Sequence, residues 1–264
     1  NNEGEWVLLN GNQTALMFVY YLITRWKELG KINGKEYIVK TIVTTETIKT
    51  IAERNGVEMY DVYTGFKWIA NVMRENEGKK NYIGGGEESY GFLCEDFVRD
   101  KDAVSACVIL AEIAAWAKDQ GLSLYQLLQK IYVEYGFSKE KGISVVKKGK
   151  SGAEEIEAMM KKFRENPLTE IAGSKVTYFY DYSTLKGKDY AENEIVTLDM
   201  PTTSNVLQYF TEDNTKVSIR PSGTEPKIKF YCEVHSKVKS IDELPEAEKA
   251  AEEKINQIKA SLGI

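Results

Sequence analysis

A short loop near the C-terminal end of the sequence combines the side chains that proteins use to hold phosphate groups. Arg220, Ser222, Gly223 and Thr224 stand within five consecutive residues, between two strand-like runs. An arginine can bind two phosphate oxygens at once, and hydroxyl groups with exposed backbone N–H groups can bind the others. The loop therefore indicates a cradle for a phosphate group, although it lacks the P-loop pattern. The ordinary alternative is a rigid hairpin with an arginine on its surface.

A second candidate loop covers residues 83–91, reads IGGGEESYG and follows a short strand-like run. Its three glycines permit positive φ angles and a close approach of other backbone segments. Glu87, Glu88 and Ser89 come next, and one carboxylate can accept hydrogen bonds from two neighbouring hydroxyl groups. We interpret the segment as a sugar-binding loop, against the alternative of a plain turn with two solvated carboxylates.

Two lysines stand in segments that carry weaker signals. Lys67 follows Thr64-Gly65-Phe66, where a strand is expected to give way to a helix. The start of a helix favours an anion, and a lysine there adds positive charge. Lys101 belongs to the run Arg99-Asp100-Lys101-Asp102, which has the composition of a surface turn. Taken alone, both lysines are typical of solvated surface positions.

The first half of the sequence must position these loops with an alternation of helices and strands. Residues 1–9 are expected to form a turn that leads into a strand. Apolar periodicity and β-branched runs then predict helices over 13–29, 45–52, 67–75, 103–119 and 123–135, with strands over 37–44, 57–63 and 81–83. This alternation is typical of an α/β layered domain.

A change of composition separates the second half of the sequence from the first. Residues 136–150 are rich in glycine and lysine, so we place a domain boundary there. Strand-like runs are then predicted over 176–180, 194–198, 206–210, 216–220 and 228–234, between helices over 151–164 and 244–262. Strands grouped between two helices indicate an α+β domain with a mostly antiparallel sheet.

Composition narrows the classes of function that the chain can have. Thirty-five basic and 40 acidic side chains give a net charge of −5, which argues against a general nucleic-acid binder. No apolar run reaches the ~18–20 residues that a membrane span needs. The three scattered cysteines fit neither a disulfide framework nor a tetrahedral metal site, and they are typical of a reducing cytoplasm. A single histidine, His235, excludes a His-rich metal or triad site.

The loops, in this order and spacing, resemble the α-D-phosphohexomutase superfamily. The strings GGGEESYGF and RPSGTEPKIKFY carry the resemblance together with TGFKWI, and it extends over essentially the whole chain. The match is closest to the phosphoglucomutase/phosphomannomutase branch near phosphopentomutase and glucose-1,6-bisphosphate synthase. The resemblance implies the tail of family domain 2 over residues 1–12 and an α/β sugar-recognition domain 3 over residues 13–136. Residues 137–264 would then form an α+β domain 4 of the TATA-binding-protein type, which binds phosphate.

Two family motifs are missing from the sequence. The Ser-His-Asn-Pro string of the phosphoserine loop is absent, and so is the Asp-x-Asp-x-Asp-Arg loop that binds Mg²⁺ in relatives. The sequence also begins with Asn1 rather than with methionine. We therefore expect a C-terminal fragment that contains no metal ligands, is inactive alone, and has the N-terminal domains of the same protein as its partner.

The resemblance also implies roles for single residues. Glu87 and Ser89 match the positions that hold the sugar hydroxyls, and Lys67 matches a substrate-facing position. Lys101 matches a lysine assigned as an acid/base or as a phosphate contact. The loop for the phosphate that is not being transferred is matched by Arg220, Ser222, Gly223 and Thr224.

The implied activity is the interconversion of hexose 1-phosphate and hexose 6-phosphate, with glucose or mannose as the sugar. In the family a phosphoserine donates its phosphoryl group, and a sugar 1,6-bisphosphate is the intermediate. Three alternatives stay open, namely a phosphopentomutase, a sugar-bisphosphate synthase and a non-catalytic module that binds phosphosugars. A nucleotide-binding protein is disfavoured because the P-loop and dinucleotide fingerprints are absent.

Overall fold

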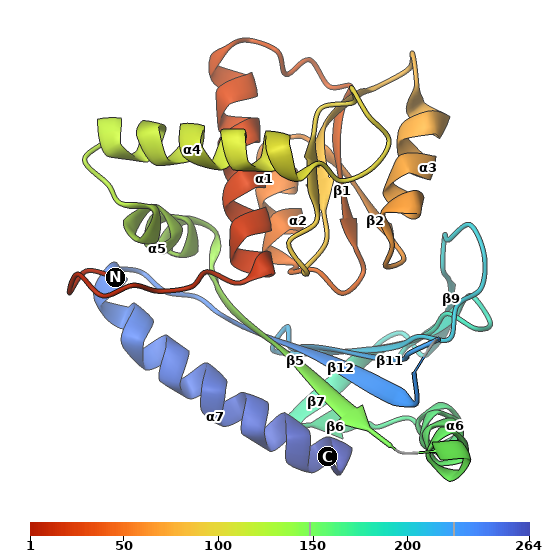
Figure 1. The fold of residues 1–264 in the computed structure, drawn as a ribbon. Helices are drawn as coiled ribbons and strands as arrows, with labels where there is room; N and C mark the ends of the chain where they lie inside the picture. The colour runs from red at the N-terminus through yellow and green to blue at the C-terminus, as the bar shows by residue number, and fades with distance from the viewer. Residues whose placement is uncertain (148, 224) are drawn as a thin grey trace. The chain divides into compact units, whose positions relative to one another are not determined.

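The chain divides into two units in a computed structural model that describes residues 1–147, 149–223 and 225–264 (Figure 1). The first unit comprises residues 1–137 with 237–244, and the second comprises residues 138–236 with 245–264. The predicted order of helices and strands is confirmed in both units for the long elements.

The first unit is built on a four-stranded sheet with the strand order β2-β1-β3-β4. Strand β1 pairs in parallel with β2 and with β3, whereas β4 runs antiparallel to β3. Its strands are β1 (Glu36–Thr41), β2 (Glu58–Val62), β3 (Asn81–Gly86) and β4 (Phe92–Cys94). Its helices are α1 (Gly11–Glu28), α2 (Thr47–Arg54), α3 (Phe66–Asn76), α4 (Ala103–Asp119), α5 (Leu124–Tyr135) and the short η1 (Ile241–Glu243).

Helices cover both faces of this sheet, so strand β1 is buried along its whole length. On one face, Tyr37 and Val39 of β1 form a core cluster with Phe66 and Ile69 of α3. Helices α1 and α2 lie on the other side of the strands (Figure 1). Because side chains alternate along a strand, a strand between two covered faces must be apolar at nearly every position. Tyr37, Ile38 and Val39 of β1 follow this rule, whereas Glu36, Lys40 and Thr41 are buried polar residues that must find polar partners.

The second unit is built on an antiparallel sheet in which β12, β11, β10, β7, β8 and β9 pair in that order. Its strands are β5 (Phe137–Val146), β6 (Glu170–Ile171), β7 (Ser174–Asp181), β8 (Lys186–Asp189), β9 (Glu194–Thr197), β10 (Leu207–Thr211), β11 (Lys216–Pro221) and β12 (Lys227–Ser236). Helices α6 (Gly149–Glu165) and α7 (Leu244–Leu262) lie below the sheet in Figure 1. This is the α+β arrangement expected from strands grouped between two helices.

The structure differs from the sequence predictions in three places. Residues 1–10 contain a turn but no strand, because nothing in that segment pairs with a sheet among the described residues. Residues 137–146, within the segment where the change of composition placed the domain boundary, form the long strand β5. Strand β3, predicted over 81–83, extends through Gly84, Gly85 and Gly86, and none of these glycines has a positive φ angle. These glycines allow close packing, since a Cβ atom on Gly85 would lie 2.3 Å from the carbonyl oxygen of Val39.

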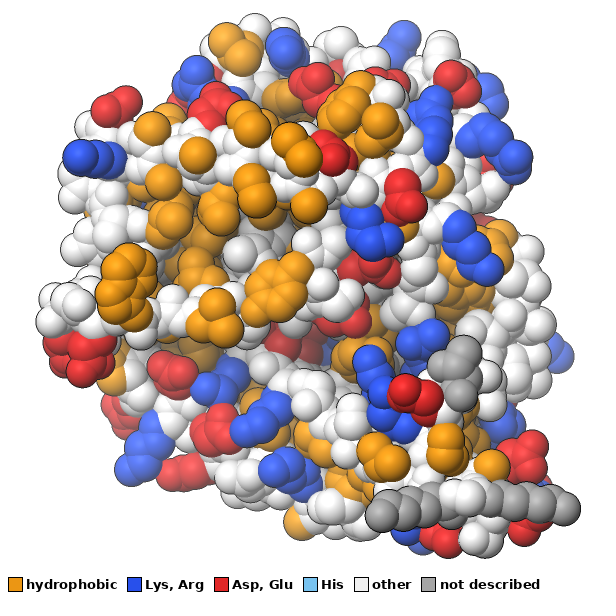
Figure 2. Space-filling model, in the orientation of Figure 1, with side chains coloured by type: hydrophobic (Ala, Val, Ile, Leu, Met, Phe, Trp, Pro, Cys, Tyr) orange, Lys and Arg blue, Asp and Glu red, His pale blue; other side chains and the backbone are white. Residues whose placement is uncertain are grey.

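Helix α4 leaves a large part of its apolar surface uncovered. Ile113 and Ala117 are buried, while Val104 and Val108 are 74% and 62% exposed. Figure 2 shows hydrophobic side chains gathered along this helix. Within the part of the chain that the structure describes, no helix is both long and apolar enough to cross a membrane.

A buried ion pair connects two neighbouring strands of the second unit. Lys216 of β11 stands opposite Glu233 of β12, and its Nζ lies 2.9 Å from Oε2 of that carboxylate. The other oxygen of Glu233 lies 2.7 Å from Nε2 of His235. Burial opposes the charged form of Glu233, but the two cations outweigh it and lower the pKa of the carboxyl.

We expect Gly85→Ala to destabilise the chain by more than the ~1–3 kcal/mol typical of overpacking, because the new methyl group meets a backbone carbonyl. Gly142→Ala in β5 is the matched control, since a Cβ atom there meets nothing within 4 Å. Urea unfolding measures both variants. A Gly85→Ala protein as stable as the control variant would contradict the close packing of β3 against β1.

A second prediction concerns pH. Burial disfavours the charged form of His235, but the Glu233 carboxylate outweighs it, so that the pKa of His235 lies above its ordinary value. A raised folded-state pKa adds stability that is fully present below pH ~6.5 and is lost as the pH rises through the folded pKa. The free energy of unfolding of the wild type should therefore fall over that window, and the fall should be smaller in His235→Gln. Equal pH slopes in urea titrations from pH 5.5 to 8.5 would refute this role for His235.

Candidate functional site

Glu87 directly follows strand β3 and reaches the start of helix α3. Its Oε1 accepts a hydrogen bond of 2.8 Å from the backbone N–H of Gly65. Gly65 has a φ angle of 112°, a conformation that only glycine adopts without strain, and it stands immediately before the first residue of α3. The anion expected at this helix start is therefore the carboxylate of the chain itself. Its charge is stabilised there by the helix dipole.

Lys101 comes from a different part of the sequence and lies beside Glu87. A Cβ atom on Gly91 would be 3.0 Å from Oε2 of Glu87 and 3.0 Å from Cδ of Lys101, so the two side chains flank Gly91. The ammonium group of Lys101 lies 5.6 Å from the ring centroid of Phe66, the first residue of α3. The fold therefore brings together an acid and a base that are fourteen positions apart in the sequence.

Two aspartates hold the backbone on either side of Lys101. The backbone N–H of Lys101 donates to Oδ1 of Asp100, and this hydrogen bond together with the Lys101 ammonium lowers the pKa of Asp100. Asp102 caps helix α4 by accepting hydrogen bonds from the N–H groups of Val104 and Ser105. The N-cap fixes where α4 begins and so fixes the position of the preceding lysine.

The other expected residues of the first unit differ in what they contact. Ser89 is exposed on the loop after β3. Lys67 is also exposed, and its ammonium lies 5.0 Å from the ring centroid of Trp68. Glu88 turns the other way and accepts a hydrogen bond of 3.3 Å from the hydroxyl group of Thr41. The structure therefore brings Glu87 and Lys101 together, with Lys67 on the helix that Glu87 contacts.

The carboxyl ends of β1, β2 and β3 meet at this edge of the sheet, where α/β folds commonly bind their ligands. Glu87 offers acceptor oxygens for hydroxyl groups, and Lys101 offers a donor for a phosphate oxygen or a proton. Sequence reasoning missed Gly65, Asp102 and Thr41, which fix these groups. The glycine before α3 and the Asp-x-x-Ser capping pattern were signals that could have found two of them.

In the second unit, Arg220 stands near the end of β11, opposite Lys229 of β12. The loop after it is closed by a hydrogen bond of 2.7 Å from the N–H of Ser222 to the carbonyl of Lys227. Gly223 is exposed and has open space around it. Thr224 lies outside the described residues. Within the described ranges Arg220 makes no ion pair, so its guanidinium can bind an anion.

The acidic side chain of this loop, Glu225, forms an ion pair with Lys227. The ammonium of Lys227 lies 2.6 Å from Oε2 of Glu225. Hydrogen bonding to Lys227, with its charge, lowers the pKa of Glu225. The negative charge of Glu225 is thus partly neutralised within the loop, which makes the loop more favourable for a phosphate group.

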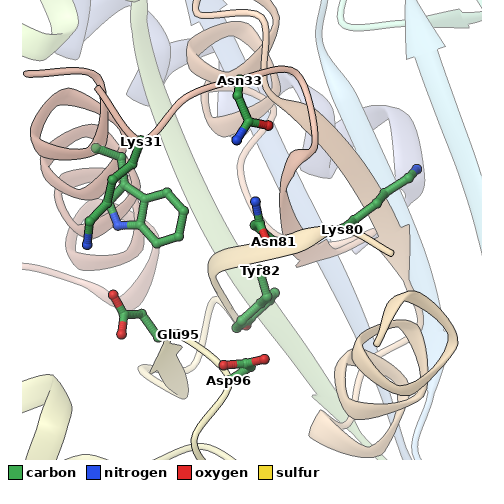
Figure 3. A pocket seen from close by; sticks show the side chains of 8 residues that line it. Lys31, Asn33, Lys80, Asn81, Tyr82, Glu95 and Asp96 are labelled. Atoms are coloured by element: carbon green, nitrogen blue, oxygen red, sulfur yellow. The ribbon is translucent and has the colours of Figure 1, made fainter. Parts of the chain in front are cut away.

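A polar pocket opens at the opposite end of the first sheet, near the amino ends of β1 and β3 (Figure 3). Its volume is about 430 Å³. None of the side chains expected from the sequence to bind substrate lines it. The lining residues are Trp26, Lys31, Asn33, Lys80, Asn81, Tyr82, Glu95 and Asp96.

The described residues include no group of three or more His, Cys, Asp or Glu side chains placed to hold a metal ion.

Comparison with known proteins relates both units to one family. Residues 10–135 match the model of phosphoglucomutase/phosphomannomutase alpha/beta/alpha domain III, and residues 144–251 match the model of the C-terminal domain of the same family. A phosphoglucomutase of Staphylococcus aureus (strain bovine RF122 / ET3-1) is 37% identical over 236 residues, which cover 87% of this chain and 40% of that protein. One from Staphylococcus haemolyticus is 32% identical over 235 residues, which cover 89% of this chain and 42% of that protein.

Solved structures show the same fold. Parafusin, an exocytosis-sensitive phosphoprotein and phosphoglucomutase from Paramecium, matches in its open form with a TM-score of 0.57 and 17% identity, over 98% of this chain and 43% of that chain. A putative phosphomannomutase from Thermus thermophilus matches with a TM-score of 0.55 and 18% identity, over 92% of this chain and 41% of that chain.

This chain thus spans about two fifths of the length of the curated relatives it matches. Within that span, the family models account for both units in order, and the resemblance found in the loop motifs is confirmed. The chain belongs to the phosphoglucomutase/phosphomannomutase family.

Proposed function

We propose that this chain is the sugar- and phosphate-binding part of a phosphohexomutase that interconverts hexose 1-phosphate and hexose 6-phosphate. Glucose or mannose is the proposed sugar, and the cytoplasm is the proposed location. Membership of the family supports this reaction class. The phosphoserine and the Mg²⁺ ligands are assigned to other parts of a longer protein, because this sequence contains neither motif.

The approach of Glu87 to Lys101 is the observation that carries the proposal. The two side chains come from separate segments and flank Gly91 at the carboxyl edge of a parallel sheet. A carboxylate beside an ammonium suits a sugar phosphate, since the carboxylate accepts from hydroxyl groups and the ammonium pairs with phosphate. A plain surface turn would not need glycine between them.

In the proposed reaction, each group of residues binds a different part of the substrate. Glu87 and Ser89 bind neighbouring sugar hydroxyls, and Lys101 donates or accepts a proton or contacts a phosphate. Arg220, Ser222, Gly223 and Thr224 hold the phosphate that is not being transferred. Lys67 adds positive charge at the start of α3. Mg²⁺, when bound to the longer protein, would stabilise negative charge on the transferred phosphoryl group.

The mechanism requires the sugar to be bound in two orientations. In the proposed cycle a phosphoryl group is added to one sugar oxygen, and the resulting 1,6-bisphosphate turns over before the other phosphoryl group is removed. Glu87 can accept from either of two adjacent hydroxyls, and Arg220 can bind any phosphate that presents two oxygens. Recognition groups of this kind bind either orientation without rearrangement of the loops.

We expect the 264-residue chain to produce no glucose 6-phosphate from glucose 1-phosphate, even with glucose 1,6-bisphosphate and Mg²⁺ present. The reason is that the sequence lacks the phosphoserine string. A coupled dehydrogenase assay measures the product, with a full-length phosphoglucomutase as the positive control. Turnover above the blank would show that this chain contains a nucleophile of its own.

Calorimetry should separate the two binding groups. Arg220→Ala is expected to weaken the binding of glucose 1,6-bisphosphate and of inorganic phosphate at least ~tenfold, as the loss of a charge-assisted hydrogen bond predicts. Glu87→Gln keeps an acceptor for Gly65 but loses charge, so it should weaken binding of the bisphosphate and leave phosphate binding unchanged. Lys186→Ala, which removes an exposed cation from β8, is the control. Wild-type affinity in both variants would remove these residues from the site.

A further inference from the structure

Glu88 stands between the two residues proposed to bind sugar, yet its side chain points into the first unit. Its Oε2 accepts a hydrogen bond of 3.3 Å from Oγ1 of Thr41, the last residue of β1. Thr41 is fully buried, at 0% exposure. A buried hydroxyl group must have a partner, because leaving it unsatisfied costs ~1–3 kcal/mol.

A second buried hydroxyl group, that of Thr44, extends this contact into a chain of hydrogen bonds with a defined donor order. Oγ1 of Thr44 lies 2.8 Å from Oγ1 of Thr41, and Thr44 is also 0% exposed. Each hydroxyl has one proton to donate. Thr41 donates its proton to the Glu88 carboxylate, so the proton between the two threonines belongs to Thr44. The order is therefore from Thr44 to Thr41 to Glu88, and such chains strengthen each bond in them.

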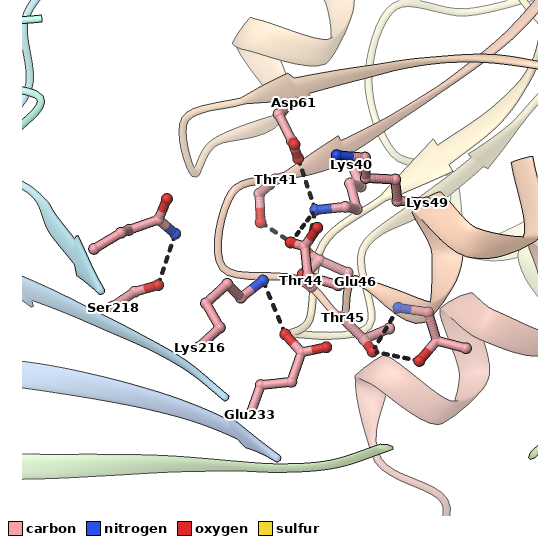
Figure 4. A network of polar contacts seen from close by, with 12 residues as sticks. Lys40, Thr41, Thr44, Thr45, Glu46, Lys49, Asp61, Lys216, Ser218 and Glu233 are labelled. Carbon is pink, nitrogen blue, oxygen red and sulfur yellow. Dashed lines mark hydrogen bonds and ion pairs between the residues drawn. The ribbon is translucent and has the colours of Figure 1, made fainter. Parts of the chain in front are cut away.

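The threonine end of this chain is fixed to the sheet. The N–H of Thr44 donates to the carbonyl of Thr41 at 2.9 Å, which closes a tight turn after β1. The carbonyl of Thr44 accepts from Nζ of Lys40 at 3.4 Å. Lys40 is buried, and its Nζ lies 2.7 Å from Asp61 of β2 and 2.9 Å from Glu46 (Figure 4). Two carboxylates thus hold Lys40, and Lys40 in turn holds the turn after β1.

The loop is also held from the side of helix α1. A Cβ atom on Gly11, the first residue of α1, would lie 1.9 Å from the carbonyl oxygen of Glu88 and 2.7 Å from the backbone nitrogen of Tyr90. The hydroxyl of Tyr90 donates to the carbonyl of Leu9 at 3.1 Å. The backbone on both sides of Ser89 therefore touches the segment at the start of α1.

We propose that Thr41 and Glu88 are positioning residues for the sugar-binding loop, and that Glu88 is not a sugar ligand. The inference rests on the proposed function of Glu87 and Ser89. Anchoring Glu88 inward directs its two neighbours outward, and it fixes them before a ligand arrives. Preorganised groups lose less entropy on binding, so the anchor raises affinity without touching the ligand.

Hydrogen exchange of the 264-residue chain, with no ligand present, tests the anchor. The peptide that covers residues 86–91 should exchange about tenfold faster in Thr41→Val and in Glu88→Gln than in the wild type. Thr41→Ser keeps the hydroxyl and should restore slow exchange. Exchange of α3 should stay unchanged in all three variants. Thr177→Val, which removes a threonine hydrogen bond to the carbonyl of Phe210 in the second unit, is the control.

Calorimetry with glucose 1,6-bisphosphate then distinguishes positioning from direct contact. If Glu88 acts through the loop, Thr41→Val and Glu88→Gln should weaken binding by a similar factor of about three to ten, and their double variant should be no weaker than either. Unchanged loop exchange in both single variants would overturn the proposal. Loss of binding in Glu88→Gln alone, with unchanged exchange, would make Glu88 a ligand instead.

Two outcomes keep this inference apart from the proposed function. If the wild type binds no sugar bisphosphate, the proposed function of the loop in this chain fails, while the exchange data still decide whether Thr41 and Glu88 hold it. If Thr41→Val does not fold, Glu88→Gln and Thr41→Ser supply the comparison, because both retain a partner for every buried hydroxyl.

Discussion

The parallel pairing of β1 with both β2 and β3 is the constraint on which the rest of the first unit depends. It brings the carboxyl ends of three strands to one edge, where Thr41 stands opposite Val62 and Gly86 stands opposite Lys40. The segment after β3 contacts the other two strands' ends: Glu88 accepts a hydrogen bond from Thr41 of β1, and Glu87 accepts one from Gly65, which follows β2. The spacing between β1 and β3 depends on Gly85, since a side chain there would meet the carbonyl of Val39. The strand spacing thus sets where the carboxylates stand.

Charge at this edge is arranged by backbone groups as much as by side chains. The N–H of Gly65 holds one oxygen of Glu87 at the start of α3. Asp102, the N-cap of α4, fixes the backbone directly after Lys101. A helix start and a capping carboxylate therefore place the acid and the base independently of each other. Both side chains are in position before a ligand binds. A charged ligand would therefore meet complementary charges with little reorganisation of the protein.

The sequence allowed the helices and most strands to be predicted because their apolar spacing follows from burial on one face or two, as in α1 and β1. It ended strand β3 too early, because glycine can serve close packing inside a strand as well as positive φ in a loop. It also did not predict most of β5, where two lysines and a glycine lie along a half-exposed strand. The opposite directions of Glu87 and Glu88 could not be predicted, since they depend on Gly65 and Thr41, which are distant in sequence.

The ion pair between Lys216 and Glu233 has a consequence for how this sequence can change over time. Replacing one member of this buried pair with a neutral residue costs about 3–5 kcal/mol, whereas an apolar pair of similar volume is tolerated. A protein that carries only one of the two substitutions is therefore expected to be less stable than either the original or the doubly substituted protein. Related sequences should therefore retain both charges or replace both together, so the two positions are expected to covary.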